Sequence, residues 1–217
     1  MSTRIGILSD THATTAPLRE ALDIFTDKGV EHIICAGDVV GYGEDNPEET
    51  IALLRQYNCL TVIGNHDVVP DTVTDPASRS VLQSFFDDLP KKIELVVEGK
   101  KIVVVHAHPP DSLHGGIKIM DPEGNVVADK KSPWLEQLVS LESDILVVGH
   151  THQVFAEYFG SLLVINPGST CFNHTCMLLT LPEMTVEILP LSGKQPIMTW
   201  NWGLFFQEQD SQSDPKP

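Results

Sequence analysis

Side chains that can bind metal ions recur along this chain, each directly after a short apolar run. They occur in the segments Asp10-Thr11-His12, Gly37-Asp38, Gly64-Asn65-His66-Asp67, His106-Ala107-His108 and Gly149-His150-Thr151-His152. Imidazole and carboxylate ligands without a thiolate suit Zn, Mn, Fe or Ni and differ from the cysteine-rich set of a structural zinc site. The chemistry that these residues allow is metal-assisted catalysis.

The number of these side chains indicates two metal ions rather than one. The candidate ligands are Asp10, His12, Asp38, Asn65, His106, His150 and His152. One ion takes about four protein ligands, so this set is sufficient for two. A short carboxylate such as Asp38 can bridge two ions. Two ions ~3.5–4 Å apart generate a hydroxide near neutral pH and hold the attacking and leaving oxygens of an in-line displacement.

Two pairs of candidate ligands share one spacing. Asp10 and His12 are two residues apart in the sequence, as are His150 and His152. In extended backbone, that spacing points both side chains of a pair to the same side.

The apolar runs before the motifs predict buried strands. They span residues 5–8, 33–36, 60–63, 102–105, 145–148 and 162–165. Each run is short, aliphatic and apolar on both faces, as buried strands of α/β proteins are. Ligands bind at the carboxyl ends of such strands, so the motif side chains should meet at one rim.

Helical patterns lie between several of these runs. Apolar residues fall on one helical face in two sets: Leu18, Leu22 and Phe25, and Leu135, Leu138, Val139 and Leu141. Three helices should begin at a capping residue followed by proline: Asn46-Pro47, Asp75-Pro76 and Ser132-Pro133. Both signals are typical of helices that cover a sheet.

The order of these elements predicts the fold class. The first half reads βαβαβα and calls for a largely parallel sheet, whereas the second half is richer in strands joined by short turns. We expect an α/β protein with a four-layer α-β-β-α sandwich, in which two packed mixed sheets are flanked by helices. Residues 1–192 should form one domain, and residues 193–217 a C-terminal extension with a disordered tail.

Composition narrows the class of protein further. The chain has 217 residues, a net charge of −16 and four cysteines without a CxxC pair. The acidic surplus disfavours nucleic-acid binding, while bound metal ions could still attract a small anionic substrate. We find no signal peptide and no apolar stretch long enough to span a bilayer, so we expect a cytoplasmic protein with no membrane contact.

The motifs, taken in order, resemble the calcineurin-like metallophosphoesterase family, and most closely its small bacterial and archaeal phosphodiesterase-like branch. The resemblance covers roughly residues 3 to 190. It implies the following roles: Asp10, His12 and His152 bind a first metal, Asn65, His106 and His150 bind a second, and Asp38 bridges them. It also implies that His66 is catalytic, through transition-state stabilisation or protonation of the leaving group. The cofactors would be two divalent ions, Mn, Fe, Zn or Ni, with Mg as a further candidate.

The chain departs from the phosphoprotein phosphatases of that family after Asp38. Their Gly-Asp motif continues into Asp-Arg-Gly, whereas here Gly41 stands for the Asp and Tyr42 for the Arg. A guanidinium clamp suits a dianionic monoester, so its absence favours a phosphodiester. We therefore expect hydrolysis of small phosphodiesters by a metal-bridging hydroxide.

Two alternatives remain at this point. One is a phosphomonoesterase or phosphoprotein phosphatase of the same fold. The other is a protein-interaction scaffold, because the retromer subunit of this fold serves chiefly as an interaction module. Loss of metal ligands would mark a scaffold, and all the candidate ligands are present here.

The sequence assigns less specific roles to three further residues, to one long loop and to the C-terminal aromatic residues. Asp67, His108 and Tyr42 are candidates for supporting the ligands or contacting substrate. Residues 108–131 should form a long loop. The aromatic residues near the C-terminus, Trp200, Trp202, Phe205 and Phe206, should pack on the core, or alternatively form the contact of a homo-oligomer.

Overall fold

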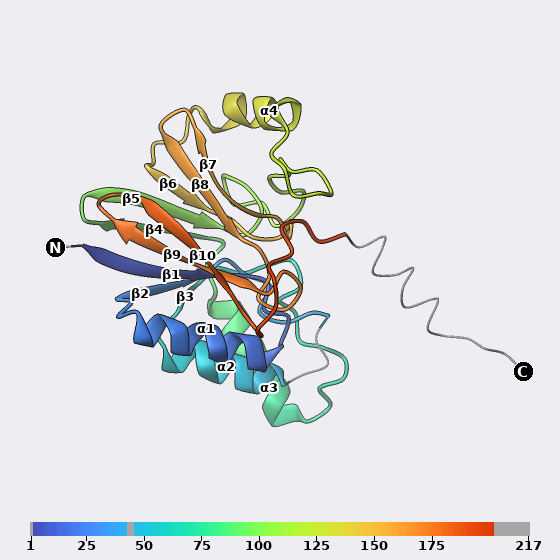
Figure 1. Ribbon diagram of the computed structural model, residues 1–217. Helices are drawn as coiled ribbons and strands as arrows, with labels where there is room; N and C mark the ends of the chain where they lie inside the picture. The colour runs from blue at the N-terminus through green and yellow to red at the C-terminus, as the bar shows by residue number, and fades with distance from the viewer. Residues whose placement is uncertain (1, 43–45, 202–217) are drawn as a thin grey trace, which may run out of the picture.

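Two mixed β-sheets form the centre of the molecule (Figure 1). The structure is a computed structural model and describes residues 2–42 and 46–201. The first sheet has the order β10 (Thr185–Pro190), β9 (Thr175–Leu181), β1 (Thr3–Leu8), β2 (His32–Cys35) and β3 (Leu60–Thr61). The second has the order β4 (Lys92–Val97), β5 (Lys100–Val105), β6 (Ile145–Val147), β8 (Leu162–Pro167) and β7 (Val154–Phe159). Every apolar run that predicted a strand forms one.

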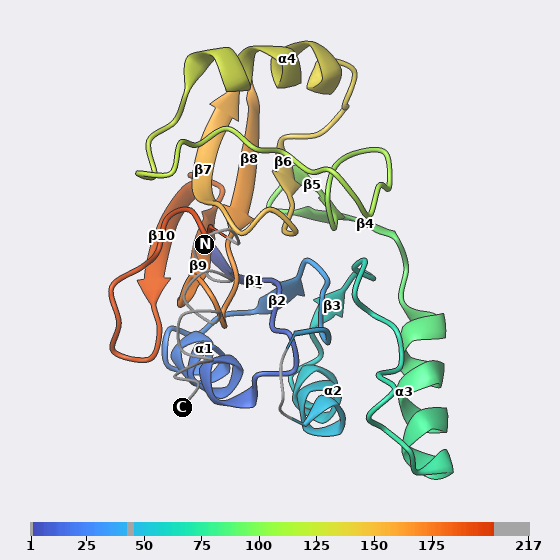
Figure 2. The ribbon, with the colours of Figure 1, turned by 90° about the vertical axis from the view of Figure 1, so that its right-hand side faces the viewer.

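Helices cover the outer faces of the two sheets (Figure 2). The first sheet is covered by α1 (Thr15–Asp27), α2 (Pro47–Gln56) and α3 (Pro76–Asp88). The second is covered by α4 (Ala128–Leu138). The predicted α-β-β-α sandwich is confirmed. No helix in the described ranges is long and apolar enough to cross a membrane.

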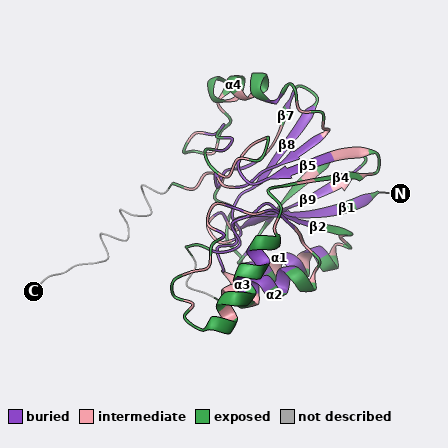
Figure 3. Cartoon of the chain, turned by 180° about the vertical axis from the view of Figure 1, so that it is seen from behind, coloured by how far each residue is buried: buried purple, intermediate pink, exposed green. Residues whose placement is uncertain are grey.

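Buried strand residues of both sheets form one core cluster, and the strands are buried along most of their length (Figure 3). Ile7 and Ile34 from the first sheet pack in one cluster with Val104 and Ile145 from the second, all without exposed surface. Burial of aliphatic side chains is the main source of stability in such a sandwich. The two sheets are therefore held firmly at the rim where their loops meet.

Parallel strands direct the motif-bearing loops to that rim. In the first sheet β1 is parallel to β2 and β2 to β3. In the second, β5 is parallel to β6 and β6 to β8. Because the carboxyl ends of parallel strands meet at one edge, the segments that follow them lie together.

Two of the three predicted helix starts are confirmed. The side chain of Asn46 accepts a hydrogen bond from Glu49 N, and that of Asp75 accepts one from Ser78 N. The third is wrong, because α4 begins at Ala128 and contains Pro133 inside it. The hydroxyl of Ser132 bonds to the carbonyl oxygen of Ala128 within the helix instead of capping it.

The two predicted apolar helix faces differ in burial. Leu18, Leu22 and Phe25 of α1 are fully buried, as expected. On α4 only Leu138 is buried, whereas Leu135 is 42% and Val139 83% exposed. The helix starts a turn earlier than predicted, and the chain leaves it after Leu138, so Val139 falls outside the packed face.

The long loop after β5 is confirmed, although its last residues belong to α4. It packs on the second sheet through Ile117 and Ile119, and Gln153 Oε1 accepts hydrogen bonds from the backbone of Ile119 and Met120. Residues 193–201 return to the same region, where Val154 N donates to Met198 O at 2.8 Å. The domain boundary at residue 192 stays a prediction, and the expected tail at residues 202–217 lies outside the described residues.

Candidate metal centre

The candidate ligands stand on tight turns at the strand ends. Asp10, His12, Asp38, His150 and His152 all have positive φ, between 46° and 64°. The prediction of extended backbone in the two ligand pairs is therefore wrong. Left-handed turns cost conformational energy in residues other than glycine, and such residues cluster at functional sites.

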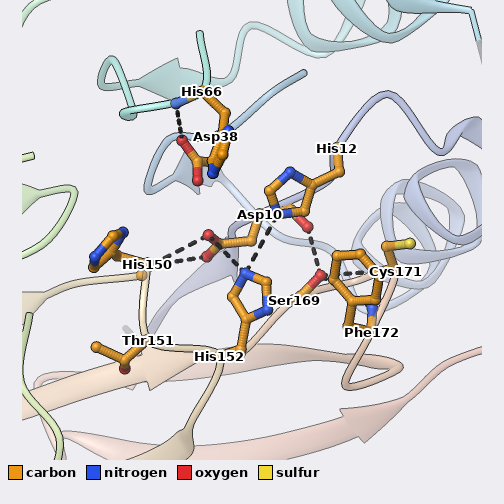
Figure 4. A network of polar contacts seen from close by, with 12 residues as sticks. Asp10, His12, Asp38, His66, His150, Thr151, His152, Ser169, Cys171 and Phe172 are labelled. Atoms are coloured by element: carbon orange, nitrogen blue, oxygen red, sulfur yellow. Dashed lines mark hydrogen bonds and ion pairs between the residues drawn. The ribbon is translucent and has the colours of Figure 1, made fainter. Parts of the chain in front are cut away.

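Asp10, His12 and His152 form a first buried group at the rim (Figure 4). One ligand atom from each residue lies within 4.8 Å of the others. The Nε2 atoms of His12 and His152 are 3.3 Å apart, and His152 Nε2 is 3.3 Å from Asp10 Oδ1. These ring nitrogens and the carboxylate thus face one small volume.

A second group contains Asp38, His106 and His150. Asp38 Oδ1 is 3.3 Å from His106 Nε2. The amide oxygen of Asn65 joins this group, at 3.0 Å from His106 Nε2 and 2.8 Å from His150 Nδ1. The pair His150 and His152 is thus divided between the two groups, because the turn between them points their rings apart.

Backbone carbonyl groups orient two of the imidazole rings. His106 Nδ1 donates to Ala36 O at 2.7 Å, and His12 Nδ1 donates to Val40 O at 3.2 Å. A proton on Nδ1 leaves the lone pair on Nε2, which faces the site in both residues. Hydrogen bonds of this kind fix the tautomer and direction of metal-binding histidines.

Asp67 holds two ligand-bearing loops together. Its carboxylate accepts hydrogen bonds from Val39 N at 2.7 Å, Val40 N at 3.1 Å and Gly64 N at 2.7 Å. The first two follow Asp38, and the third precedes Asn65. The geometry is that of a supporting residue, as the sequence suggested.

The carboxylates also connect the two groups through the backbone. Asp10 accepts from His150 N at 3.1 Å, and Asp38 accepts from His66 N at 2.9 Å (Figure 4). A loop from the other group therefore contacts Asp10 directly. That Asp38 bridges two ions stays a prediction.

Burial and mutual charge shift the pKa values of these side chains. Burial lowers the pKa of His12 to about 4, and burial with the charge of His106 lowers that of His150 to about 4. Burial opposes ionisation of Asp10, but the charge and hydrogen bond of His152 outweigh it and lower its pKa. The lowered pKa values keep His12 and His150 neutral, and the lowered pKa of Asp10 keeps it ionised, as binding of a divalent cation requires of its ligands.

The donor set fits a pair of divalent metal ions. Each group offers a carboxylate and two imidazole nitrogens within 4.8 Å, and Asn65 adds an amide oxygen to the second. Asp10 and Asp38 are buried, and their charges demand compensation there. Bound cations supply that compensation, so we expect these seven residues to be the ligands.

The remaining predicted residues lie in different places. His66 stands beside the first group, with its ring centroid 5.7 Å from that of His12. The ring of Tyr42 is 4.5 Å from that of His66. His108 belongs to neither ligand group; its Nδ1 donates to Pro109 O, and its ring packs 5.5 Å from that of Trp134.

Two supporting residues were not among the predicted site residues. Ser169 Oγ donates to Asp10 O at 2.6 Å, and Asn166 Nδ2 donates to Gly149 O at 3.0 Å. Both belong to the Asn166-Pro167-Gly168-Ser169 segment, which follows an apolar run as the ligand motifs do. That position was the signal available in the sequence.

The fold and this site define a class of metal-dependent hydrolases. A family model, the calcineurin-like phosphoesterase superfamily domain, matches residues 3–184. The chain belongs to the calcineurin-like phosphoesterase superfamily, and the family resemblance of its motifs is confirmed.

Individual relatives agree with this assignment. The chain is 29% identical over 180 residues to uncharacterised protein MJ0912 of Methanocaldococcus jannaschii, covering 76% of this chain and 68% of that protein. It is 27% identical over 172 residues to phosphodiesterase MJ0936 of the same organism, covering 77% and 84%. A solved metallophosphoesterase from Sphaerobacter thermophilus shares the fold, with a TM-score of 0.64 at 20% identity over 100% of this chain and 96% of that one.

Proposed function

We propose that this phosphoesterase hydrolyses phosphodiesters at a centre of two divalent metal ions. The observation that carries the proposal is the pair of buried ligand groups, each with a carboxylate and two histidines. When bound, two such ions activate water and neutralise charge on the phosphoryl oxygens. The complete ligand set argues against a scaffold without catalysis.

The protein's own residues hold and orient the reacting groups. Asp67, Ala36 and Val40 fix the ligand loops and rings, so little reorganisation is needed during reaction. His66 lies beside the first group without belonging to either. Its position supports a role in donating a proton to the leaving oxygen or in stabilising the phosphoryl oxygens.

The space around Gly41 supports a diester rather than a monoester. A Cβ atom at Gly41 would lie 2.9 Å from His12 Nδ1 and 3.0 Å from His66 Cβ, and its φ is +136°. The Asp of the phosphoprotein phosphatase motif does not fit here without displacing two histidines. Tyr42 in place of the Arg removes a fixed positive charge that a dianionic monoester would use.

We also propose a metal ion, a cellular compartment and an oligomeric contact. Histidine-rich sites favour Mn, Fe, Zn or Ni over Mg, and we propose Mn as one suitable ion. Cys35 and Cys176 are buried thiols, which supports a reducing compartment such as the cytoplasm. A homo-oligomer through the C-terminal aromatic residues remains part of the proposal.

A substrate panel tests this function. We expect the protein loaded with Mn, Ni, Zn or Mg to hydrolyse p-nitrophenyl diesters faster than p-nitrophenyl phosphate. The double variant Asp38→Asn/His106→Asn serves as the inactive control, because it removes two members of one ligand group. Efficient turnover of the monoester with almost none of the diesters would contradict the substrate assignment.

A further inference from the structure

Three aromatic side chains from separate segments converge beside the first ligand group. Tyr42 follows β2, Phe172 follows β8, and Trp200 belongs to the C-terminal segment. The ring centroids of Tyr42 and Phe172 are 6.2 Å apart, and those of Phe172 and Trp200 are 5.0 Å apart. We call these three residues the aromatic cluster.

The aromatic cluster contacts the candidate ligands directly. The ring of Phe172 stacks on that of His152, with centroids 5.3 Å apart and planes 24° apart, and lies 5.3 Å from that of His12 (Figure 4). Tyr42 lies 5.2 Å from His12. A group bound at the aromatic cluster would therefore be next to the first ligand group.

The backbone brings Trp200 to this place with specific bonds. Trp200 N donates to His152 O at 3.1 Å, and Asn173 Nδ2 donates to the carbonyl oxygens of His152 and Ile197. The C-terminal segment is thus anchored on a ligand-bearing loop. Trp200 lies beyond the family match, which ends at residue 184.

Support of the ligands alone does not explain the aromatic cluster. Phe172 can orient His152 by stacking, but Tyr42 is 51% exposed although it stands at the rim of the site. Exposed aromatic rings beside a catalytic centre provide flat apolar area for a ligand. Stacking on such rings accepts any planar π-system and needs no charge on either partner.

We propose that the aromatic cluster is a subsite for a planar aromatic group on the phosphodiester substrate, either an aryl ester or a nucleobase. This inference rests on the proposed function and adds a substrate class to it. Tyr42, where related phosphatases have Arg, replaces charge recognition of phosphate by stacking against the ester group. Phe172 and Trp200 extend the same apolar surface.

Diesters that share a p-nitrophenolate leaving group test this subsite. The second ester group is methyl, cyclohexyl, phenyl or thymidine 5′, so only the group that remains on phosphorus changes. In Tyr42→Leu and in Phe172→Leu, we expect the kcat/KM ratio of phenyl or thymidine to methyl to fall about 3- to 10-fold. Differences in intrinsic reactivity and in metal content cancel when this ratio is compared between variants.

Tyr158→Leu is the matched control, because Tyr158 on β7 is 52% exposed and is not part of the aromatic cluster. Its ratios should equal those of the native protein. A fall for both aromatic groups indicates general stacking, and a fall for thymidine alone indicates a nucleobase. Equal ratios in the native protein and both cluster variants, or an equal fall for cyclohexyl, would overturn the proposal.

Binding provides a readout that needs no turnover. Calorimetry on the Mn-loaded protein should show phenylphosphonate binding about 3- to 10-fold more tightly than methylphosphonate, with the preference lost in Tyr42→Leu. Equal affinities in the native protein would overturn the subsite. If the phenyl preference is present but no diester is hydrolysed, the proposed function fails and the aromatic subsite stands.

Discussion

His66 shows how the turn at a strand end separates a proposed ligand from a proposed catalytic side chain. Its neighbour Asn65 points its amide oxygen at His106 and His150, whereas His66 lies beside His12 and Tyr42. The backbone N–H of His66 donates a hydrogen bond to Asp38, which fixes the backbone position of His66. The ring therefore stands beside the first ligand group without belonging to either group.

Replacing His66 by alanine should leave metal binding intact and slow turnover. General acid catalysis contributes about 10²- to 10⁴-fold, so kcat for an alkyl leaving group should fall within that range. We expect the lower end, because Gly41 provides no carboxylate to orient the ring. The measurement is kcat together with metal content by elemental analysis.

Leaving-group dependence identifies the role of His66. A p-nitrophenolate needs little protonation, so the loss should shrink for that substrate if His66 is an acid. A similar loss for both leaving groups would assign charge stabilisation on the phosphoryl oxygens instead. Loss of one metal ion from the variant would show that His66 is a ligand and would refute this placement.

The pKa of His106 predicts proton release when metal binds. Burial acts to lower this pKa, but the hydrogen bond and charge of Asp38 outweigh it and raise the pKa from 6.5 to about 9. Between these values the metal-free histidine is protonated, and a metal ion must displace the proton. Calorimetry at about pH 8 in buffers of different ionisation enthalpy should therefore show release of about one proton. Because metal binding releases this proton, metal affinity should rise as pH increases toward about 9.

The raised pKa of His106 also makes the stability of the metal-free protein depend on pH, in the direction opposite to that of the metal affinity. A histidine whose pKa is raised in the folded state stabilises the metal-free protein below pH 6.5, and this contribution disappears as pH rises through about 9. His106→Asn should remove both effects, whereas His32→Asn, an exposed site on β2, should change neither. Metal binding without proton uptake or release in the native protein would refute the assignment.

The sequence allowed the candidate ligands to be selected but did not predict the backbone that presents them. Residue type and position after a strand were sufficient to select Asp10, His12, Asp38 and the others, and the structure brings them together. The positive φ angles were missed, because they depend on hydrogen bonds between distant loops, and the division of His150 from His152 came from the family resemblance and not from their spacing. Local spacing carries no information on such bonds.

At the scale of elements, the loops after β2 and β3 act as one unit. Asp67 joins them through three backbone N–H donors, and Gly64 packs directly against Asp38, where a Cβ atom would collide with the carboxylate and its backbone. Burial and the charge of Asp38 raise the pKa of Asp67 to about 7. The loops are thus held by a carboxylate in an unfavourable environment.

Asp67→Asn should weaken the connection between the loops after β2 and β3. The amide oxygen can still accept from Val39 and Val40, but the NH₂ group then faces the N–H of Gly64, and an unsatisfied buried donor costs about 1–3 kcal/mol. Residues that support ligands typically contribute about 10- to 100-fold to metal affinity. Urea unfolding and metal titration measure both effects.

The comparison variant is Asp71→Asn, an exposed carboxylate in the following loop. It should match the native protein in stability and affinity. Native-like metal affinity in Asp67→Asn would show that the loops hold their positions without this carboxylate.

Secondary structure was predictable where one local signal dominated. Apolar runs gave the strands, and Asn46 and Asp75 gave two helix starts. The start of α4 was missed, because Pro133 is tolerated within that helix and tertiary packing of the preceding loop sets where it begins. Its exposed Leu135 and Val139 show that apolar spacing alone does not decide which face is buried.

At the scale of the molecule, each ligand group draws on both sheets. The first takes Asp10 and His12 from the loop after β1 and His152 from the loop after β6. The second takes Asp38 from the loop after β2 and two histidines from the loops after β5 and β6. A metal ion in either group therefore connects the two halves of the sandwich at its rim.

Metal binding should consequently stabilise the whole fold. A ligand at 100 times its dissociation constant stabilises the folded state by about 2.7 kcal/mol, and each kcal/mol shifts Tm by about 2–4 °C in a chain of this size. We expect Mn to raise Tm by about 5–10 °C over the chelator-treated protein, as measured by calorimetry. His152→Asn should lose much of this increase, because it removes the contribution of the second sheet to the first group. His174→Asn, which lies outside both groups, should keep it. If Mn left Tm unchanged in the native protein, or raised it equally in His152→Asn, the ions would not connect the sheets in this way.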